Sequence, residues 1–453
     1  MNIIIAGDGE VGFHLAKMLH GENHNITIVD PHEDLLRLIE SHTDLLTITG
    51  DSTDPKVLKE ARVSKADLLI SVLHDQQTNL LTAAVSKKLG AKRTIARVSD
   101  PGYLRKDIKE LFLSMGVDEI VSPESIAANN IIDLLKQAAA TEIFKFSYGR
   151  LSLFLLNLEK GAPVVNKTLN EIAKEFPILN FRAIAILRDS KAFIPTGSDK
   201  FLENDLAYVI TKSDGITTLL ELGGKQRLTI NNIIIVGGGR IGRRTAKKLG
   251  KNLNIKLIES DKKRCEIIVN DFEKTLVING DARNIELLKD EGVENIDAFI
   301  AVTDDSETNI LTCLHAKKLG AKKTIALVEN IDYIDIAQSI GINTIINKKL
   351  ITAGYISRFT HGAEVTKLKC LSRIDAEVFE FVAKKNSPVT KKKIRDLNTP
   401  DGCIIGGIIR DKEAFIAVGD FQIKPNDRVV VLSFPKAVPK VEKMFKPKPF
   451  ILG

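Results

Sequence analysis

The sequence predicts an α/β protein built from two doubly wound parallel sheets, each followed by a small α+β domain, in the order A–B–A′–B′. Two observations lead to this prediction. The first is a repeat: residues 78–100, TNLLTAAVSKKLGAKRTIARVSD, return 230 positions later as residues 308–330, TNILTCLHAKKLGAKKTIALVEN. The second is an alternation, within each copy, of short apolar runs and segments with helical spacing, which is typical of parallel sheets covered by helices.

The first copy, residues 1–122, shows the alternation clearly. Residues 2–6 (NIIIA) are apolar and run into a cluster of glycines, after which Val11, Leu15 and Leu19 recur at helical spacing. Further strands are expected at 25–30, 45–49, 68–72, 93–98 and 119–121, and helices at 32–41, 51–62, 78–89 and 103–115. The second copy, residues 231–348, follows the same order, with strands expected at 233–236, 256–259, 276–278, 298–302, 324–328 and 344–346.

Two shorter regions, 140–225 and 365–446, also resemble each other. The matching segments are 161–164 with 386–389, 186–189 with 408–411, and 204–205 with 426–427. Short apolar runs separated by turn residues predict a small α+β domain for each region. Helices near 123–140 and 347–361 are expected to connect each parallel sheet to its small domain.

A glycine-rich loop, Gly7-Asp8-Gly9-Glu10-Val11-Gly12, follows the first strand. In a Rossmann-like fold the first glycine allows the tight turn, the second lets the backbone approach a pyrophosphate, and the third lets the next helix pack on the sheet. The helix then presents free N–H groups to the anion. Asp30 ends the second strand, 18 residues after Gly12, where an acid accepts hydrogen bonds from ribose hydroxyls and disfavours a 2′-phosphate. The pattern predicts an NAD site.

The second copy carries the equivalent loop, Gly237-Gly238-Gly239-Arg240-Ile241-Gly242, and Glu259 stands where the first copy has Asp30. A glutamate can accept hydrogen bonds from ribose hydroxyls as well as an aspartate can. Arg240 replaces Glu10, and Arg243 and Arg244 add positive charge after the loop. The two sites are therefore expected to differ in ligand or occupancy, and a degenerate second site is an open alternative.

Other polar residues follow later strands of each copy. Asp51 and Asp281 come after a strand and a glycine, and are either nucleotide contacts or helix N-caps. His74-Asp75 and Asp304-Asp305 end the fourth strands, at the carboxyl edge where such sheets bind ligands, and the alternative is again helix capping. Arg97 suits a phosphate contact or a surface position, and the second copy has Leu327 in its place.

Composition and charge narrow the class of protein. No run of 18 uncharged apolar residues appears, and the start lacks the pattern of a signal peptide, so neither a membrane span nor a leader is expected. The four cysteines are scattered, as in a reducing cytosol, and no metal site is expected. Of the net charge of +7, the excess lies in residues 361–453, with 18 Lys/Arg against 11 Asp/Glu. A solvated surface, an acidic partner or an anionic membrane would explain it. With 5% aromatic residues and no tryptophan, nucleic acid is disfavoured.

No catalytic pattern accompanies the glycine loops. The sequence has no Tyr-x-x-x-Lys, no P-loop and no His-Glu-x-x-His, and its eight histidines are dispersed. A dehydrogenase needs a proton donor or acceptor beside the nicotinamide. Binding is therefore favoured over catalysis, with an NAD-dependent oxidoreductase as the less favoured alternative.

The order GDGEVG, IVD, TGD, TNLLTA and GAKRTIARV, followed by an α+β module and then repeated, resembles the TrkA family of Trk-type potassium-uptake regulatory proteins over nearly the whole chain. The resemblance identifies the A segments with nucleotide-binding domains of the RCK (KTN) type and the B segments with their C-terminal domains. It implies NAD(H), and ATP or ADP, as ligands, a homo-oligomeric ring, and a cytoplasmic position on the inner face of the cell membrane. The implied partner is a TrkH-type membrane potassium transporter, and a different cation transporter is the open alternative.

Carried over by position, the resemblance adds Leu73 to the first site and Thr303 to the second. The implied first site comprises Gly7 to Gly12, Asp30, Asp51, Leu73, His74 and Arg97. The implied second site comprises Gly237 to Gly242, Glu259, Asp281, Thr303 and Asp304. Leu327 departs from the arginine of the first copy, which leaves phosphate contact at the second site in question.

Overall fold

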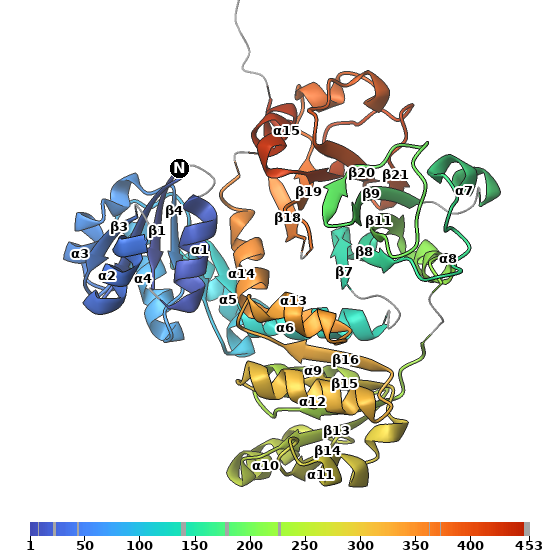
Figure 1. Ribbon diagram of the computed structural model, residues 1–453. Helices are drawn as coiled ribbons and strands as arrows, with labels where there is room; N and C mark the ends of the chain where they lie inside the picture. Colours follow the sequence, from blue (N-terminus) through green and yellow to red (C-terminus); the bar gives the residue numbers. More distant parts are fainter. Residues whose placement is uncertain are drawn as a thin grey trace, which may run out of the picture.

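The computed structural model describes residues 1–7, 9–20, 24–42, 45–136, 142–176, 181–224, 228–361, 363–371 and 373–447 (Figure 1). These residues form two six-stranded parallel sheets and two five-stranded antiparallel sheets, which alternate along the chain. The predicted fold class, two Rossmann-like sheets each followed by a small α+β domain, is confirmed.

The first parallel sheet has the strand order β3-β2-β1-β4-β5-β6. Its strands are β1 (Asn2–Ala6), β2 (Asn25–Asp30), β3 (Leu46–Thr49), β4 (Leu68–Ser71), β5 (Thr94–Arg97) and β6 (Glu119–Val121). Its helices are α1 (Glu10–His20), α2 (Glu33–His42), α3 (Pro55–Glu60), α4 (Gln76–Lys88) and α5 (Lys106–Ser114). The order reverses between β1 and β4, so the carboxyl end of β1 lies at the switch point where such sheets bind ligands.

The second parallel sheet repeats this order as β14-β13-β12-β15-β16-β17. Its strands are β12 (Asn232–Val236), β13 (Asn254–Glu259), β14 (Leu276–Asn279), β15 (Ala298–Ala301), β16 (Lys323–Leu327) and β17 (Thr344–Ile346). Its helices are α9 (Arg240–Leu249), α10 (Lys262–Ile268), α11 (Ile285–Asp290), α12 (Ser306–Lys318) and α13 (Tyr333–Ser339). The predicted strands are present in both copies.

One predicted helix, 51–62, is shorter than expected. Helix α3 begins at Pro55, after Asp54, whose side chain accepts a hydrogen bond from the Lys56 N–H at 2.8 Å. Proline fits the first turn of a helix because its missing N–H would have no partner there. The helix is over by Arg62, which has a left-handed φ of 55°.

The small domains are antiparallel sheets with helices at their ends. The first has the strand order β10-β9-β11-β8-β7 and the second β18-β19-β22-β20-β21. The elements of the first are β7 (Glu142–Phe146), β8 (Leu151–Asn157), α7 (Leu169–Glu175), β9 (Phe181–Arg188), β10 (Lys191–Phe193), β11 (Leu206–Lys212) and α8 (Ile216–Leu222). Those of the second are β18 (Val365–Cys370), β19 (Glu377–Val382), β20 (Cys403–Arg410), β21 (Glu413–Ile416), β22 (Arg428–Ser433) and α15 (Val438–Phe445).

The repeated Arg and Asp residues of the small domains form the same ion pair twice. The Arg188 guanidinium donates two hydrogen bonds, both of 2.8 Å, to the buried Asp205 carboxylate. Arg410 and Asp427 repeat this pair at 2.9 and 2.8 Å. A bidentate pair of this kind fixes the turn before a strand, because both partners are held in one geometry. The sequence match at these positions therefore has a structural explanation.

The two small domains pack against each other through a shared core. Buried side chains of β8, β9 and β11 join those of β19 and β22, among them Tyr208, Val378 and Val430. Across this interface the Ser147 hydroxyl donates a hydrogen bond of 2.9 Å to the fully buried Glu380 carboxylate. A buried carboxylate needs such partners.

The connecting helices are exchanged between the two halves of the chain. Helix α6 (Pro123–Lys136) leaves the first sheet and packs against α9 of the second, where Ala127 and Ile131 share a core with Ile241. Helix α14 (Lys348–Ser357) leaves the second sheet and packs against α1 of the first, where Ile356 meets the Leu15 cluster (Figure 1). The sequence predicted α6 and α14 as connections but did not predict their exchange. Local sequence patterns do not reveal which sheet a helix covers.

A buried lysine marks the end of the exchanged helix α6. Lys323 is 2% exposed, and its Nζ donates a 3.4 Å hydrogen bond to the Leu134 carbonyl in the last turn of α6. Burial lowers the pKa of this amine to about 7. Between pH 7 and 10 this amine is therefore protonated in the unfolded chain and largely neutral in the folded chain. Because the unfolded chain binds more protons, the free energy of unfolding rises with pH across that window.

We expect this slope to be visible in the denaturant midpoint measured as a function of pH. In Lys323→Met the midpoint should rise less steeply between pH 7 and 10 than in the unmodified chain, by up to about 1.4 kcal/mol of unfolding free energy per pH unit. The exposed Lys318→Met is the matched control and should keep the full slope. Equal slopes in all three proteins would show that Lys323 does not titrate in this range.

Candidate nucleotide-binding sites

The first glycine loop joins β1 to α1 in a tight turn that only glycine fits. Gly7 has a φ of +120°, and a Cβ there would lie 3.0 Å from the Leu73 nitrogen. A Cβ on Gly12 would lie 2.0 Å from the Gly7 carbonyl oxygen, so the close packing of α1 requires glycine. Gly9 is different, since the nearest atom to its Cβ position is the Nε2 of His74 at 4.0 Å. The open space above Gly9 is where a pyrophosphate would approach the backbone.

Two predicted members of the first loop cannot be placed in detail. Asp8 lies outside the described residues, and the same is true of the Glu10 side chain. Val11 is half-buried and packs against the core that contains Leu15. Its role is therefore to hold the first turn of α1 on the sheet.

The second loop repeats this geometry with one addition. Gly237 has a φ of +101°, and a Cβ on Gly242 would again lie 2.0 Å from the carbonyl oxygen of the first glycine. Gly239 has open space around it and precedes α9 with no side-chain cap. The addition is a close contact at Gly238, where a Cβ would lie 2.9 Å from Glu259 Oε2 and 2.7 Å from the Ile268 side chain. Arg240 is exposed, and Ile241 is buried in the core shared with α6.

The acids that end the second strands are both buried but have different partners. Asp30 is 2% exposed, and its Oδ1 accepts hydrogen bonds from the His32 N–H at 3.0 Å and the ring Nδ1 at 2.7 Å. Glu259 Oε2 accepts a 2.8 Å bond from the Gly238 N–H, because the longer side chain reaches the glycine loop. Its Oε1 accepts from the Asp261 N–H at 2.9 Å. The loop and the acid therefore already contact each other in the second copy.

Asp51 and Asp281 do not cap the helices that follow them, so that alternative is wrong. Asn284 caps α11, as Asp54 caps α3. Asp51 instead accepts hydrogen bonds from the Thr53 N–H and hydroxyl, both at 2.8 Å, which lower the pKa of its carboxyl. Asp281 is held by the Arg283 guanidinium at 2.6 Å.

Both residues follow a glycine whose N–H donates a hydrogen bond to the carbonyl of the acid predicted to bind ribose. The Gly50 N–H donates to the Asp30 carbonyl at 2.9 Å, and the Gly280 N–H donates to the Glu259 carbonyl at 3.0 Å. The turns that carry Asp51 and Asp281 are thus fixed to the ends of β2 and β13. This position beside the ribose acid is compatible with the predicted nucleotide contact.

At the ends of the fourth strands, the second residue of each pair, an aspartate in both copies, caps a helix. Asp75 accepts a 2.7 Å bond from the Thr78 N–H at the start of α4, and Asp305 accepts a 2.7 Å bond from the Thr308 N–H at the start of α12. The capping interpretation is therefore confirmed for Asp75 and Asp305. His74 and Asp304, the residues proposed for the sites, are exposed at the same sheet edge.

Two buried asparagines, missed in the sequence, hold these edges in place. Asn79 accepts a 2.8 Å bond from the Leu73 N–H and donates to the Leu73 and Arg97 carbonyls at 2.9 and 3.0 Å. Asn309 does the same for Thr303 and Leu327, with a further 2.7 Å bond from the Thr303 hydroxyl. The signal was available, since each is the second residue of the repeated Thr-Asn segment.

Arg97 is paired with an acid that the sequence reading also missed. Its guanidinium lies 3.4 Å from Glu124 Oε1, and Glu124 stands in the first turn of the exchanged helix α6. Arg97 Nε and Glu124 Oε2 are buried and have no hydrogen-bond partner among the described residues. Leu327 is 2% exposed and apolar in the second copy. The first site therefore has a charged arginine at this position, and the second site has an apolar leucine.

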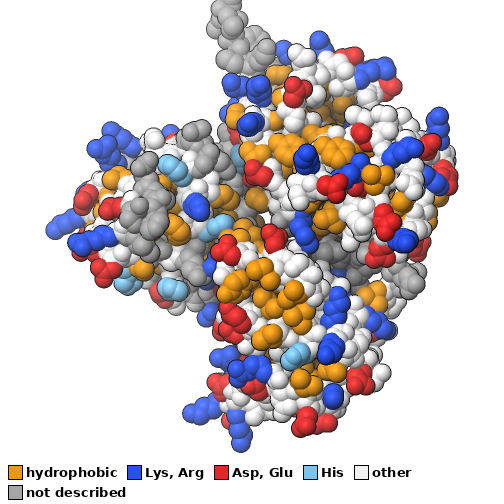
Figure 2. Space-filling view, in the orientation of Figure 1, with side chains coloured by type: hydrophobic (Ala, Val, Ile, Leu, Met, Phe, Trp, Pro, Cys, Tyr) orange, Lys and Arg blue, Asp and Glu red, His pale blue; other side chains and the backbone are white. Residues whose placement is uncertain are grey.

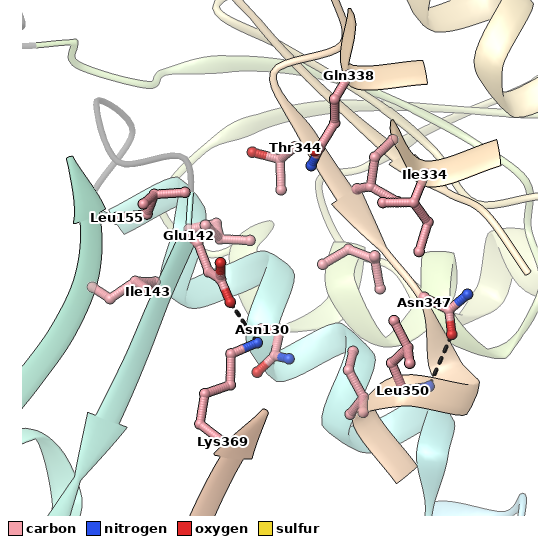
Figure 3. A pocket seen from close by; sticks show the side chains of 14 residues that line it. Asn130, Glu142, Ile143, Leu155, Ile334, Gln338, Thr344, Asn347, Leu350 and Lys369 are labelled. Carbon is pink, nitrogen blue, oxygen red and sulfur yellow. Dashed lines mark hydrogen bonds and ion pairs between the residues drawn. The ribbon is translucent and has the colours of Figure 1, made fainter. Parts of the chain in front are cut away.

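A small cavity of about 80 Å³ lies away from both loops, between the connecting helices α6 and α14 and strands of the two small domains and the second parallel sheet (Figure 3). Across it the Lys369 ammonium of β18 lies 2.7 Å from the Glu142 carboxylate of β7. Its lining comes from α6, β7, β8, α13, β17, α14 and β18. The volume would hold a few water molecules and is far too small for a dinucleotide.

Within the described ranges no cluster of three or more His, Cys, Asp or Glu side chains has the geometry of a metal site. None of the helices described is long and apolar enough to cross a membrane.

The fold and the paired glycine loops define a class: tandem Rossmann-like domains of the nucleotide-binding type, each with a small antiparallel domain attached. Comparison with protein families agrees. The model of the TrkA-N domain matches residues 3–123 and 233–348, and that of the TrkA-C domain matches residues 153–223 and 378–446. The chain belongs to the TrkA family of Trk system potassium uptake proteins.

Similar proteins cover the full length of the chain. The Trk system potassium uptake protein TrkA of Vibrio alginolyticus is 34% identical, with all of both chains covered. That of Haemophilus influenzae is 32% identical, again over both full lengths. The TrkA homolog 1 of Methanosarcina mazei is 30% identical over 98% of this chain and 100% of its own.

Solved structures show the same fold. The GsuK RCK domain superposes with a TM-score of 0.62 at 20% identity, covering 98% of this chain and 94% of its own. The GsuK channel bound to NAD gives the same TM-score and identity, covering 98% of this chain and 78% of its own.

Proposed function

We propose that this chain is the peripheral cytoplasmic regulatory subunit of a Trk-type potassium uptake system. It binds NAD(H) at its glycine loops, and the bound state controls potassium flux through a TrkH-type membrane transporter. The observation that supports this most strongly is the pair of glycine loops, each beside a buried acid at a switch point, in a chain that matches Trk potassium uptake proteins end to end. The fold shared with the GsuK channel bound to NAD supports the choice of nucleotide.

The exchanged helices offer a route from nucleotide to movement. Glu124, beside Arg97 at the first site, belongs to the first turn of α6. Helix α6 packs on α9, whose first residues belong to the second glycine loop. A ligand that binds Arg97 would therefore act, through Glu124, on helix α6, which contacts the second parallel domain. Such a ligand shifts the arrangement only by its difference in affinity between two states.

Two nucleotides that compete for one loop would form a switch. ATP and ADP share the adenosine and diphosphate groups of NAD, so the loop and the ribose acid fit each of them. Each nucleotide then favours the arrangement that it binds more tightly. The nucleotides act as ligands rather than substrates in this proposal, in keeping with the lack of a catalytic pattern in the sequence.

Exposed apolar side chains support assembly of several chains into a ring. Large side chains on α4 and at the C-terminal end of α5 are exposed, and those on α12 and at the C-terminal end of α13 repeat them. They are Leu81, Leu111 and Met115 in the first half, and Leu311, Ile336 and Ile340 in the second. Figure 2 shows the second group as a hydrophobic patch over α12 and α13. Contiguous exposed apolar surface marks a contact surface. The repeated patch suits a homo-oligomer in which like faces meet.

Calorimetry of the purified chain with NAD⁺, NADH, ATP and ADP tests the proposal. We expect saturable binding without turnover, lost at the first site in Gly9→Val and at the second in Gly239→Val. The fold leaves space for a side chain at both positions. No binding at either loop, or steady oxidation or reduction of the nucleotide with an added hydroxy or carbonyl compound, would contradict the proposed role.

A further inference from the structure

Lysines gather on one face of the second small domain. The segment that contains the short helix η7 (Pro388–Thr390) and the terminal helix α15 pack against each other, which brings two separate parts of the sequence to one end of the domain. The face comprises the exposed residues Lys385, Lys391, Lys392, Lys436, Lys440 and Lys443, here called the basic face. In Figure 1, α15 lies at the end of the molecule far from the second parallel sheet.

The charges of the basic face are not neutralised by any residue that the structure describes. Neighbouring cations have acidic partners: Lys384 pairs with Glu364, Lys393 and Arg395 pair with Asp420, and Lys446 pairs with Glu442. Among the described residues, no carboxylate lies within ion-pair distance of the six lysines. The face therefore presents about six positive charges to solvent.

Helix α15 is fixed to the domain in a way that leaves its lysines outside. Val441 and Phe445 are each 1% exposed, and the Phe445 ring stacks on Phe381 with centroids 4.5 Å apart. Lys440 and Lys443 are exposed on the same helix. The lysines are thus carried by a rigid element rather than by a loose segment.

The composition of the face favours lipid over protein as its partner. Protein interfaces are enriched in aromatic residues, methionine and arginine, and depleted in lysine. The basic face has only lysines, and in the described part of this domain Val418 is the one large apolar side chain that is mostly exposed. Clustered, hydrated lysine ammonium groups suit attraction to an anionic headgroup layer, which requires no shaped pocket.

The first small domain lacks this feature. Around its helix α7, Lys160, Lys167 and Lys174 alternate with Glu159, Glu171 and Glu175, so positive and negative charges balance. The asymmetry between two otherwise similar domains gives the chain one basic end, which would orient it on a charged surface.

We propose that the basic face docks the protein on the anionic phospholipid surface of the membrane, with the second small domain turned toward the lipid. The proposal rests on the proposed function in placing the chain beside a membrane transporter. It adds the surface that makes the contact and the chemical class of its partner.

Flotation of the purified full chain with vesicles tests it. Vesicles of phosphatidylcholine alone are compared with vesicles of equal parts phosphatidylcholine and phosphatidylglycerol, at low and high salt. The variant Lys391→Gln, Lys392→Gln, Lys440→Gln, Lys443→Gln is matched by a control that removes four exposed charges from the first small domain: Lys160→Gln, Lys174→Gln, Lys191→Gln, Lys200→Gln. Calorimetry with NAD⁺ accompanies each protein.

We expect binding to the anionic vesicles only, weakened by salt. Each removed charge of the face should lower the partition coefficient about fivefold, so the fourfold variant should lose two orders of magnitude or more, while the control stays near the unmodified chain. Equal binding to both vesicles, or equal losses in variant and control, would overturn the proposal. Copurification with the membrane transporter is compared for the same proteins. A fourfold variant that keeps vesicle binding but no longer copurifies would also overturn the proposal, because the face would then be a protein interface. Unchanged NAD⁺ binding separates any of these failures from failure of the proposed function.

Discussion

Gly12→Ala should destabilise the first parallel domain by about 2–4 kcal/mol, the range of severe overpacking. The added Cβ would lie 2.0 Å from the Gly7 carbonyl oxygen and 3.0 Å from the Gly7 carbonyl carbon. Both are backbone atoms of a turn that already has a left-handed φ, so neither can move aside cheaply. Denaturant unfolding followed by circular dichroism measures the loss, and Gly242→Ala should reproduce it in the second domain, where the distance is the same.

Gly9→Ala and Gly239→Ala are the matched controls for this result. The Cβ of Ala at position 9 would have its nearest neighbour at 4.0 Å, and at position 239 it would have none within 4 Å. Neither glycine has a left-handed φ. Both variants should unfold near the midpoint of the unmodified chain. Equal destabilisation of Gly9→Ala and Gly12→Ala would show that the loop is not packed as described.

Asp30→Ala should weaken NAD⁺ binding at the first site by about 1–3 kcal/mol, which raises the Kd by about 5- to 150-fold. The carboxylate is buried at the end of β2, where it would accept hydrogen bonds from the ribose hydroxyls. Calorimetry on a chain whose second site is disabled by Gly239→Val isolates this effect.

Two comparisons sharpen the Asp30 experiment. Asp30→Asn keeps the shape of the side chain and removes its charge. The Kd of this variant for NAD⁺ should therefore lie between that of the unmodified chain and that of Asp30→Ala. Asp67→Ala removes an aspartate at the opposite edge of the same sheet, where the carboxylate accepts a 2.8 Å bond from the Asn2 N–H and pairs with Lys92. It should leave the Kd unchanged. If Asp30→Ala and Asp67→Ala both bind NAD⁺ like the unmodified chain, the ribose role of Asp30 is wrong.

Much of the fold follows from local patterns. Apolar runs such as residues 2–6 become strands buried on both faces, and the repeat of the glycine loops placed both sheets correctly. The details that the sequence reading missed depend on contacts between distant residues. Asn79 and Glu124 look like ordinary helix residues, and only the fold brings them to Arg97. The helix caps Asp54 and Asn284 lie three residues after Asp51 and Asp281, the predicted candidates, because several acids and amides compete for this role at these turns.

The exchange of α6 and α14 has a consequence for how the two sites are paired. Two identical subunits that swapped such helices would separate on dilution and could form only pairs of like sites. Here both partners are parts of one polypeptide, so every pair contains one loop with Glu10 and one loop with Arg240, in fixed stoichiometry at any concentration. A cell that makes this chain cannot make one kind of site in excess of the other, and each copy was free to diverge without losing its counterpart.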